Sequence, residues 1–208
     1  MADRTINRVW LWAVVAASVL MALPAYRYLL PGAPGGGSGV LANRFTHVGA
    51  LTVHAGFAAT ALLIGPLQFI PGLRARRRTL HRRIGVTYVT CVLCGGLAGL
   101  VLSFGTTGGP VVGAGFGVLA IVWLICTANA WRLAVGRSFM AHERWMIRSF
   151  ALTLAAVTLR IYMPLAAALH LDMPTAYAAI AWLCWVPNLI VAEIYLALRP
   201  NRLAGAAV

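Results

Sequence analysis

Acidic residues are almost absent from this chain of 208 residues. Its carboxylate side chains are Asp3, Glu143, Asp172 and Glu193, it has no lysine, and charged residues make up 10% of the sequence. A soluble domain carries about a quarter of its residues as charged ones. Together with a hydrophobic content of 61%, this scarcity excludes an ordinary soluble fold and predicts an integral membrane protein.

Cysteine is also scarce, and its pattern carries little chemistry. The string Cys91-Val-Leu-Cys94 has redox or zinc spacing, but no second pair stands at zinc spacing and no βαβ pattern surrounds it. It lies inside an apolar run, as do Cys126 and Cys184. Free cysteine is among the most buried residues and packs as a small hydrophobic side chain. We therefore expect the four cysteines to pack in this way.

The basic residues are abundant by contrast: 17 arginines give a net charge of +13. In a soluble chain this charge would suggest nucleic acid. Here fourteen of the arginines flank apolar runs on one predicted side, whereas Arg27 and Arg44 fall on the other and Arg160 falls in neither loop. Arginine-rich short loops stay cytoplasmic. We expect both termini and the loop at residues 74–83 to be cytoplasmic, with anionic lipid as the partner there and no nucleic acid.

The apolar runs predict an all-α membrane protein that forms one domain over residues 1–208. A span needs about 20 apolar residues. The six predicted spans are residues 10–30, 45–70, 79–104, 112–131, 142–169 and 175–198. Residues 31–44 form an external linker rich in Gly and Pro. We expect the second to fifth spans to make a four-helix bundle, the first and sixth to be peripheral, and Pro164 to kink the fifth. The expected location is the inner membrane of a bacterium.

Two histidines begin spans on the cytoplasmic side and predict an inner site. His81 opens the third span and His142 the fifth, and these spans are diagonal neighbours in a bundle of sequence order. Imidazole is a ligand for haem and divalent metals, so the pair predicts axial ligation of haem b from opposite walls. Gly85, one turn from His81, would leave room for the porphyrin. The arginines expected near its propionates are Arg82, Arg83 and Arg148.

The remaining histidines predict a less regular outer level. His47 and His54 share a helix face about 10.5 Å apart along the axis, so one iron cannot take both, and His170 is a further ligand candidate for a haem or metal there. Arg160 lies at membrane depth, where a charge needs a partner, and an anionic propionate or a quinone oxygen would supply one. The alternative is that His47, His142 and His170 are interfacial residues with wet ring tips.

Four sequence blocks resemble a known family. These are His47-x6-His54 with Gly65 and Gln68, Arg78-Thr-Leu-His81-Arg-Arg-Ile-Gly-Val-Thr-Tyr88, His142-Glu-Arg-Trp-Met-Ile-Arg-Ser-Phe-Ala-Leu-Thr153 with Arg160, and Trp182-Leu-Cys-Trp-Val-Pro-Asn188 with Glu193. Over about residues 45–195 the chain resembles the bacterial membrane family DUF2306, which implies a multi-span membrane protein. Its layout is also similar to the diagonal histidine pairs of cytochrome b561-type bundles, but the fourth span has no histidine.

Two classes of function follow from these patterns. The first is a b-type haem or quinone-linked electron-transfer protein, a possible membrane oxidoreductase with a membrane redox partner. The second is a small-molecule transporter or channel lined by the histidine and glycine stripes, against which stands the lack of short broken helices in matching positions. A non-catalytic membrane partner subunit is a third reading.

Overall fold

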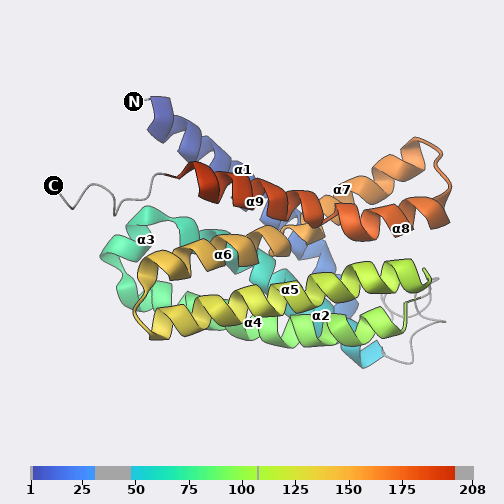
Figure 1. Ribbon diagram of the computed structural model, residues 1–208, viewed down its shortest axis with the longest axis horizontal. Coiled ribbons are helices and arrows are strands. Elements are labelled where there is room, and N and C mark those ends of the chain that lie inside the picture. The colour runs from blue at the N-terminus through green and yellow to red at the C-terminus, as the bar shows by residue number, and fades with distance from the viewer. Residues whose placement is uncertain (1, 31–47, 107, 200–208) are drawn as a thin grey trace.

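The computed structural model describes residues 2–30, 48–106 and 108–199, and these ranges contain helices and no strand. The predicted linker at residues 31–44 and His47 lie outside the described residues. The elements in chain order are α1 (Ala2–Ala22), the 3₁₀ segment η1 (Leu23–Leu29), α2 (Val48–Ile64), the 3₁₀ segment η3 (Gly65–Phe69), α3 (Pro71–Arg76), α4 (Arg78–Phe104), α5 (Pro110–Val135), α6 (Phe139–Thr153), α7 (Ala155–Ala168), α8 (Met173–Leu183) and α9 (Val186–Leu198). Figure 1 shows their arrangement.

Five helical segments of the described chain are long and apolar enough to cross a membrane. They are Gly49–Phe69, Arg78–Phe104, Pro110–Val135, Phe139–Ala168 and Met173–Leu198. The first predicted span, residues 10–30, instead contains a shorter apolar stretch, Leu11–Arg27, which passes from α1 into η1 at Leu23 beside Pro24. The architecture is thus that of a helical membrane protein with five candidate spans and a shorter N-terminal helix.

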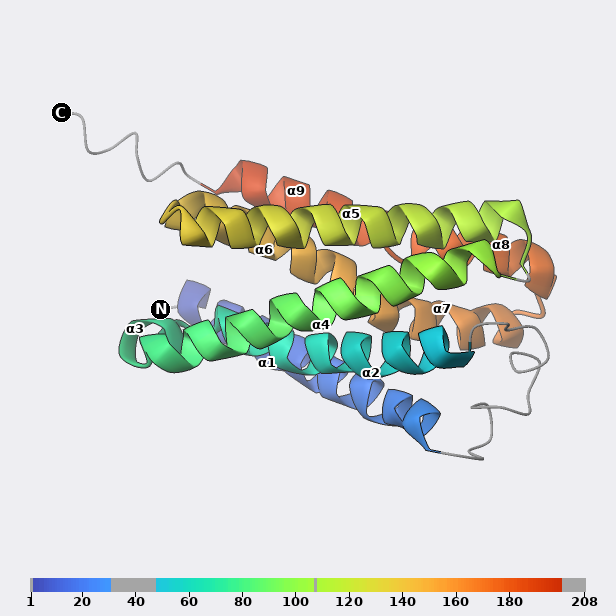
Figure 2. The same ribbon diagram turned by 90° about the horizontal axis from the view of Figure 1, so that it is seen from below.

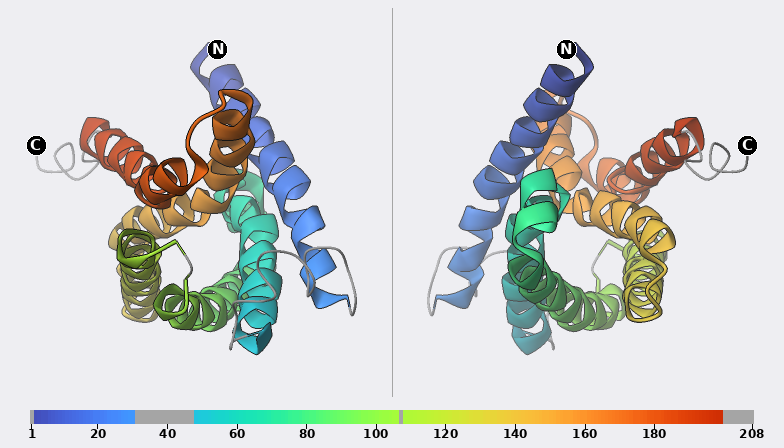
Figure 3. Two further views of the ribbon diagram at one scale, coloured as in Figure 1. Left: turned by 90° about the vertical axis from the view of Figure 1, so that its right-hand side faces the viewer. Right: turned by 90° about the vertical axis from the view of Figure 1, so that its left-hand side faces the viewer.

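Helices α2, α4, α5 and α6 pack side by side in chain order around a buried core, as the end-on views of Figure 3 show. Small residues allow this close packing. A Cβ atom on Gly95 of α4 would lie 3.2 Å from the backbone N of Ala58 in α2, and one on Gly96 would lie 2.8 Å from Leu124 Cδ2 in α5. Helix α1 packs on the outside of α2 (Figure 2), where the hydroxyls of Tyr26 and Thr60 are 2.9 Å apart.

Two of the long segments are broken in the middle. The fifth predicted span breaks at Leu154, between α6 and α7, ten residues before Pro164, which lies inside α7. The hydroxyl of Thr153 donates to Ser149 O at 2.9 Å, a bond to the preceding turn that bends helices. The sequence does not predict this break, and Pro164, which is expected to kink the helix, lies inside α7.

The last span breaks at Cys184 and Trp185, because Pro187 in the first turn of α9 cannot donate a backbone hydrogen bond. Side chains replace lost backbone bonds there: Asn188 Nδ2 donates to Cys184 O at 3.0 Å. The same amide bonds Thr158 Oγ1 at 3.0 Å, just beyond the break in α6 and α7, so the two breaks lie side by side. The apolar pattern predicts one span for each segment, which agrees with the candidate spans Phe139–Ala168 and Met173–Leu198, but it does not predict the two breaks.

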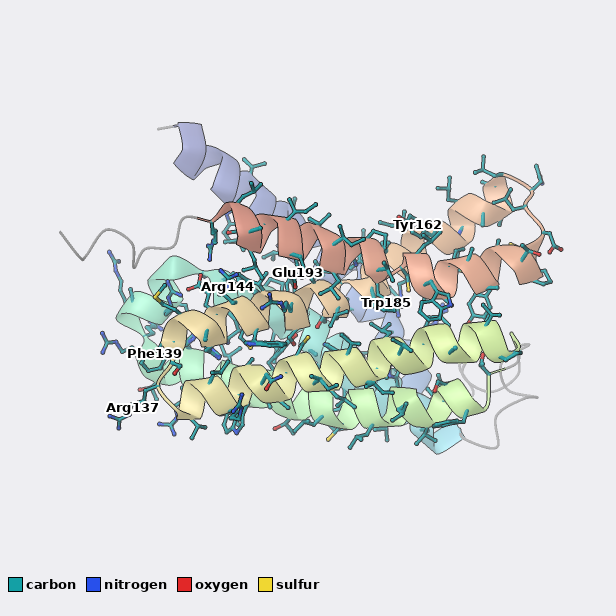
Figure 4. The ribbon with its side chains drawn as sticks, in the orientation of Figure 1. Arg137, Phe139, Arg144, Tyr162, Trp185 and Glu193 are labelled. Atoms are coloured by element: carbon teal, nitrogen blue, oxygen red, sulfur yellow. The ribbon has the colours of Figure 1, made fainter. Side chains whose placement is uncertain are left out.

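The two halves of these broken segments have different neighbours. The outer halves α7 and α8 form a hairpin whose turn contains His170 at φ 53°, and Asp172 caps α8 by accepting from Thr175 N at 3.1 Å. Hydrogen bonds from the side chain and backbone of Thr175 hold the pKa of Asp172 below its ordinary value. The inner half α9 lies along α6 (Figure 4), where Arg144 donates to Leu196 O at 3.3 Å.

Candidate functional site

The inner histidines come together at one end of the bundle. His81 lies in the first turn of α4 and His142 in the first turn of α6, and the two imidazoles are within electrostatic range of each other. The start of α1 and the end of α9 lie at this same end of the molecule, where α3 also lies (Figures 1 and 2). Because each histidine lies in the first turn of its helix, both rings are at the same level of the bundle.

Each inner ring has one nitrogen whose environment matters for ligand binding. His142 Nδ1 is 2.8 Å from Ala130 O in α5, so this nitrogen carries a hydrogen, and in the neutral tautomer Nε2 has the lone pair. Histidines that bind metals are held by such a bond to a carbonyl. His81 Nδ1 is buried and has no hydrogen-bond partner among the described residues. A buried nitrogen without a partner costs about 1–3 kcal/mol, which a bound group could recover.

Two residues assigned to the inner site have other neighbours. The side chain of Gln68 lies against Gly85, with its Oε1 3.5 Å from where a Cβ of residue 85 would stand, and its Nε2 donates to His81 O at 3.3 Å. The room beside Gly85 thus holds an amide side chain. Arg148 forms a two-pronged ion pair with Glu193 of α9, with N–O distances of 2.5 and 2.8 Å. Its charge is therefore matched by a carboxylate.

A second ion pair cluster stands at the inner rim. Glu143 of α6 accepts from Arg74 of α3 at 2.9 Å and from Arg199, beyond α9, at 2.6 Å. All three side chains are partly exposed, so each contact contributes at most about 1 kcal/mol. The cluster joins three elements at the end where His81 and His142 lie.

At the outer level His54 and Arg160 lie within electrostatic range of each other. His54 Nδ1 is 2.8 Å from Gly95 O of α4, and Arg160 of α7 is within electrostatic range of the ring. The guanidinium of Arg160 also donates to Ala156 O at 2.9 Å. His170 is exposed in the α7–α8 turn and is a member of no site that the described residues form.

Between the two levels lies a buried polar network that the sequence did not single out. Tyr88 of α4 bonds Ser149 and Thr153 of α6 at 2.9 and 2.7 Å, across the bundle. Thr127 of α5 bonds Ser149 at 2.6 Å, and Trp123 Nε1 donates to Thr153 at 3.0 Å. All five side chains are buried. Spacings of seven residues from His81 to Tyr88 and from His142 to Ser149, two helical turns, were the available signal.

The buried network has fewer hydroxyl hydrogens than hydrogen-bond contacts that need one. Five contacts require a hydroxyl hydrogen: Tyr88 with Ser149, Tyr88 with Thr153, Thr127 with Ser149, Thr127 with Trp123 O, and Thr153 with Ser149 O. The four hydroxyl groups supply one hydrogen each. One contact is therefore always left without its own hydrogen, and removal of the Tyr88 hydroxyl leaves three contacts for three hydrogens.

This count predicts that two mild substitutions lower the free energy of unfolding by different amounts. Thr153→Val removes the acceptor of the buried Trp123 N–H, and we expect a loss of about 1–3 kcal/mol in the free energy of unfolding. Tyr88→Phe leaves every remaining hydroxyl paired, and its expected cost is below about 1 kcal/mol. Unfolding by a denaturing detergent, followed by circular dichroism, measures both variants. A Tyr88→Phe variant less stable than Thr153→Val would contradict the count.

Metal ligands do not cluster in the described part of the chain. No group of three or more His, Cys, Asp and Glu side chains stands there at metal-binding distance. Cys91, Cys126 and Cys184 are buried and Cys94 is partly buried, all without disulfides. The candidate ligands of the described residues are thus the histidine pair and the single His54.

The fold and the two polar levels define a class: a polytopic helical membrane protein with ionisable residues inside its spans. The chain belongs to the family described as predicted membrane proteins, DUF2306, whose model matches residues 51–196. No curated protein and no solved structure matches the chain. The resemblance seen in the sequence is therefore confirmed, and function must be argued from the sites themselves.

Proposed function

We propose that the protein binds one b-type haem between His81 and His142 and carries electrons in the membrane. The observation that carries the proposal is the state of the two rings. They lie within electrostatic range of each other at the starts of α4 and α6, His142 has its Nδ1–H on a carbonyl with Nε2 available, and His81 has a buried nitrogen without a partner among the described residues. Two imidazoles on opposite walls are the donor set of a low-spin haem.

The residues around His81 and His142 fit a haem in part. Arg82 and Arg83 are exposed at the start of α4 and would provide counter-charge for propionates, in place of Arg148, which is held by Glu193. Haem binding would require the Gln68 side chain beside Gly85 to turn away from the ring edge and give up its hydrogen bond to His81 O. Haem would supply one-electron chemistry, while the chain's part is to hold two neutral imidazoles in fixed orientation.

The purified protein tests this proposal directly. We expect protein expressed with haem supplied to be coloured and to give a reduced-minus-oxidised spectrum of a b-type haem with two histidine ligands. The same preparation heated and extracted should yield about one haem per chain, as the single inner pair requires. A colourless protein that is folded by circular dichroism would contradict the proposal.

A second candidate function, transport of a small molecule, is favoured by the two broken helices. Transporter sites are often built where spans are interrupted near the membrane midplane. The breaks at Leu154 and at Cys184 lie side by side, joined by the bond between Thr158 and Asn188. This candidate predicts a colourless protein and substrate-dependent uptake into vesicles, so the haem spectrum separates the two functions.

The charge distribution predicts the orientation of the chain. We propose that the end containing α3 is cytoplasmic and contacts anionic lipid, because Arg74, Arg76, Arg77 and Arg78 are exposed there. A cysteine at Arg76 should be protected in intact cells from a reagent that cannot cross the membrane, whereas one at Asp172, in the α7–α8 turn, should react. The native cysteines lie within candidate spans, and the unmodified protein is the control. The reverse labelling pattern would overturn this orientation.

A further inference from the structure

The outer level contains an imidazole with one committed and one available nitrogen. His54 Nδ1 donates to Gly95 O at 2.8 Å, so Nε2 carries a lone pair. No residue of the described chain forms a hydrogen bond with Nε2. A neutral histidine in this state is a hydrogen-bond acceptor inside a candidate span, Gly49–Phe69.

The ring of His54 is also fixed in place by α4. A Cβ atom on Gly99 would lie 2.9 Å from His54 Nδ1 and 3.0 Å from Cε1, closer than packed atoms approach. The ring therefore rests directly on the backbone of α4, between Gly95 and Gly99. The lone pair of His54 Nε2 therefore points in one fixed direction.

A permanent donor lies within electrostatic range of this acceptor. Arg160 of α7 is within electrostatic range of His54, and its guanidinium carries N–H donors and no acceptor. Both residues lie within candidate spans, which favours a ligand that dissolves in the membrane. The pair thus offers one acceptor and one cationic donor to a lipid-soluble molecule.

The chemistry of the pair selects the ligand. A carboxylate or a fully ionised phosphate has acceptors alone and would face the lone pair of His54 with no hydrogen between them. A ketone also has only acceptors and cannot donate a hydrogen to His54 Nε2. A phenolic hydroxyl satisfies both residues with one oxygen, because its hydrogen is donated to His54 Nε2 while its oxygen accepts from Arg160.

We propose that His54 and Arg160 bind a hydroxyl group of a membrane-soluble hydroquinone. The proposal deepens the proposed electron-transfer function by naming the class of its electron donor. It rests on that function for the donor's role, whereas binding itself needs no haem. Gly95 and Gly99 act as positioning residues, since they set the direction of His54 Nε2.

The first test uses the unmodified full chain in detergent without haem. Binding of a benzohydroquinone with a decyl tail is measured by calorimetry under anaerobic conditions and compared with binding of its dimethyl ether. The ether keeps the oxygens that accept from Arg160 and lacks the hydrogen for His54. We expect it to bind about tenfold more weakly or worse, the effect of one unpaired buried acceptor.

Substitutions assign the effect to the two residues. His54→Phe should weaken hydroquinone binding by about tenfold or more and abolish the preference over the ether. Arg160→Leu should weaken both ligands, because both use an oxygen that accepts from the guanidinium. His170→Phe, a histidine exposed in the α7–α8 turn, is the matched control and should bind as the unmodified protein does.

Two results with the unmodified chain would overturn the proposal, whatever the variants do. One is equal affinity for the hydroquinone and its ether. The other is tighter binding of dodecyl phosphate than of the hydroquinone, which would mark an oxyanion site. Colour tests the haem, and ligand preference tests the hydroquinone site. A colourless protein that prefers the hydroquinone supports this site and contradicts the haem. A coloured protein without the preference supports the haem and contradicts this site.

Discussion

Replacement of either inner histidine by alanine is expected to remove the haem spectrum from the protein. Removal of a residue that merely orients a metal ligand costs 10–100-fold in affinity, so loss of an axial ligand should cost at least about 100-fold. His81→Ala and His142→Ala remove ligands from α4 and α6 separately. The measurement is the reduced-minus-oxidised spectrum per mole of purified chain, with haem supplied during expression.

The matched control for this pair is His170→Ala. His170 is exposed in the α7–α8 turn, at the other end of α7 from the break at Leu154, and its removal should leave the spectrum unchanged. Size-exclusion chromatography and circular dichroism check that each variant is folded. A haem spectrum that survives both His81→Ala and His142→Ala would show that the iron is held elsewhere, and this assignment would be lost.

Among the described glycines, Gly65→Ala should be the most destabilising substitution by alanine. A Cβ atom on residue 65 would stand 2.5 and 2.6 Å from ring atoms of Phe150 and 3.2 Å from Tyr88 Cε2. Both aromatic rings are buried, Tyr88 fully. Because overpacking a tight core costs 1–3 kcal/mol and sometimes more, we expect a loss of about 3 kcal/mol.

Gly49→Ala is the matched control, since no atom lies within 4 Å of its Cβ position in the first turns of α2. There the methyl group should be neutral or stabilise the helix by up to about 1 kcal/mol. Unfolding midpoints in denaturing detergent compare the two variants. Equal midpoints would mean that Phe150 moves freely, and that η3 does not pack on α6 as described.

The inner histidine level could be read from the sequence because it depends on a single property, the position of each span's start. Apolar length is a local and additive quantity, so it places His81 and His142 at one end regardless of how the helices are rotated. Arginine spacing and the motif blocks around these histidines likewise indicated the membrane class and the family. These features require no knowledge of which side chains touch.

The partners of these residues were decided by the tertiary structure. Helix rotation and crossing angle set whether Gly85 faces an open space or Gln68, and whether Arg148 meets a ligand or Glu193. The break at Leu154 depends on a hydroxyl bond to the preceding turn, which competes with regular helix only in that packing environment. Proline was the stronger sequence signal, yet Pro164 remains inside α7.

The sequence by itself determined that this chain is a helical membrane protein of the DUF2306 family with ionisable residues at two depths. Hydropathy, charge and motif spacing suffice for that, because each is a property of short stretches. Only the tertiary structure decided that Tyr88, Ser149 and Thr153 form a buried network and that His54 lies within electrostatic range of Arg160. Such pairs join residues far apart in the chain, and their contact depends on how four helices pack against one another.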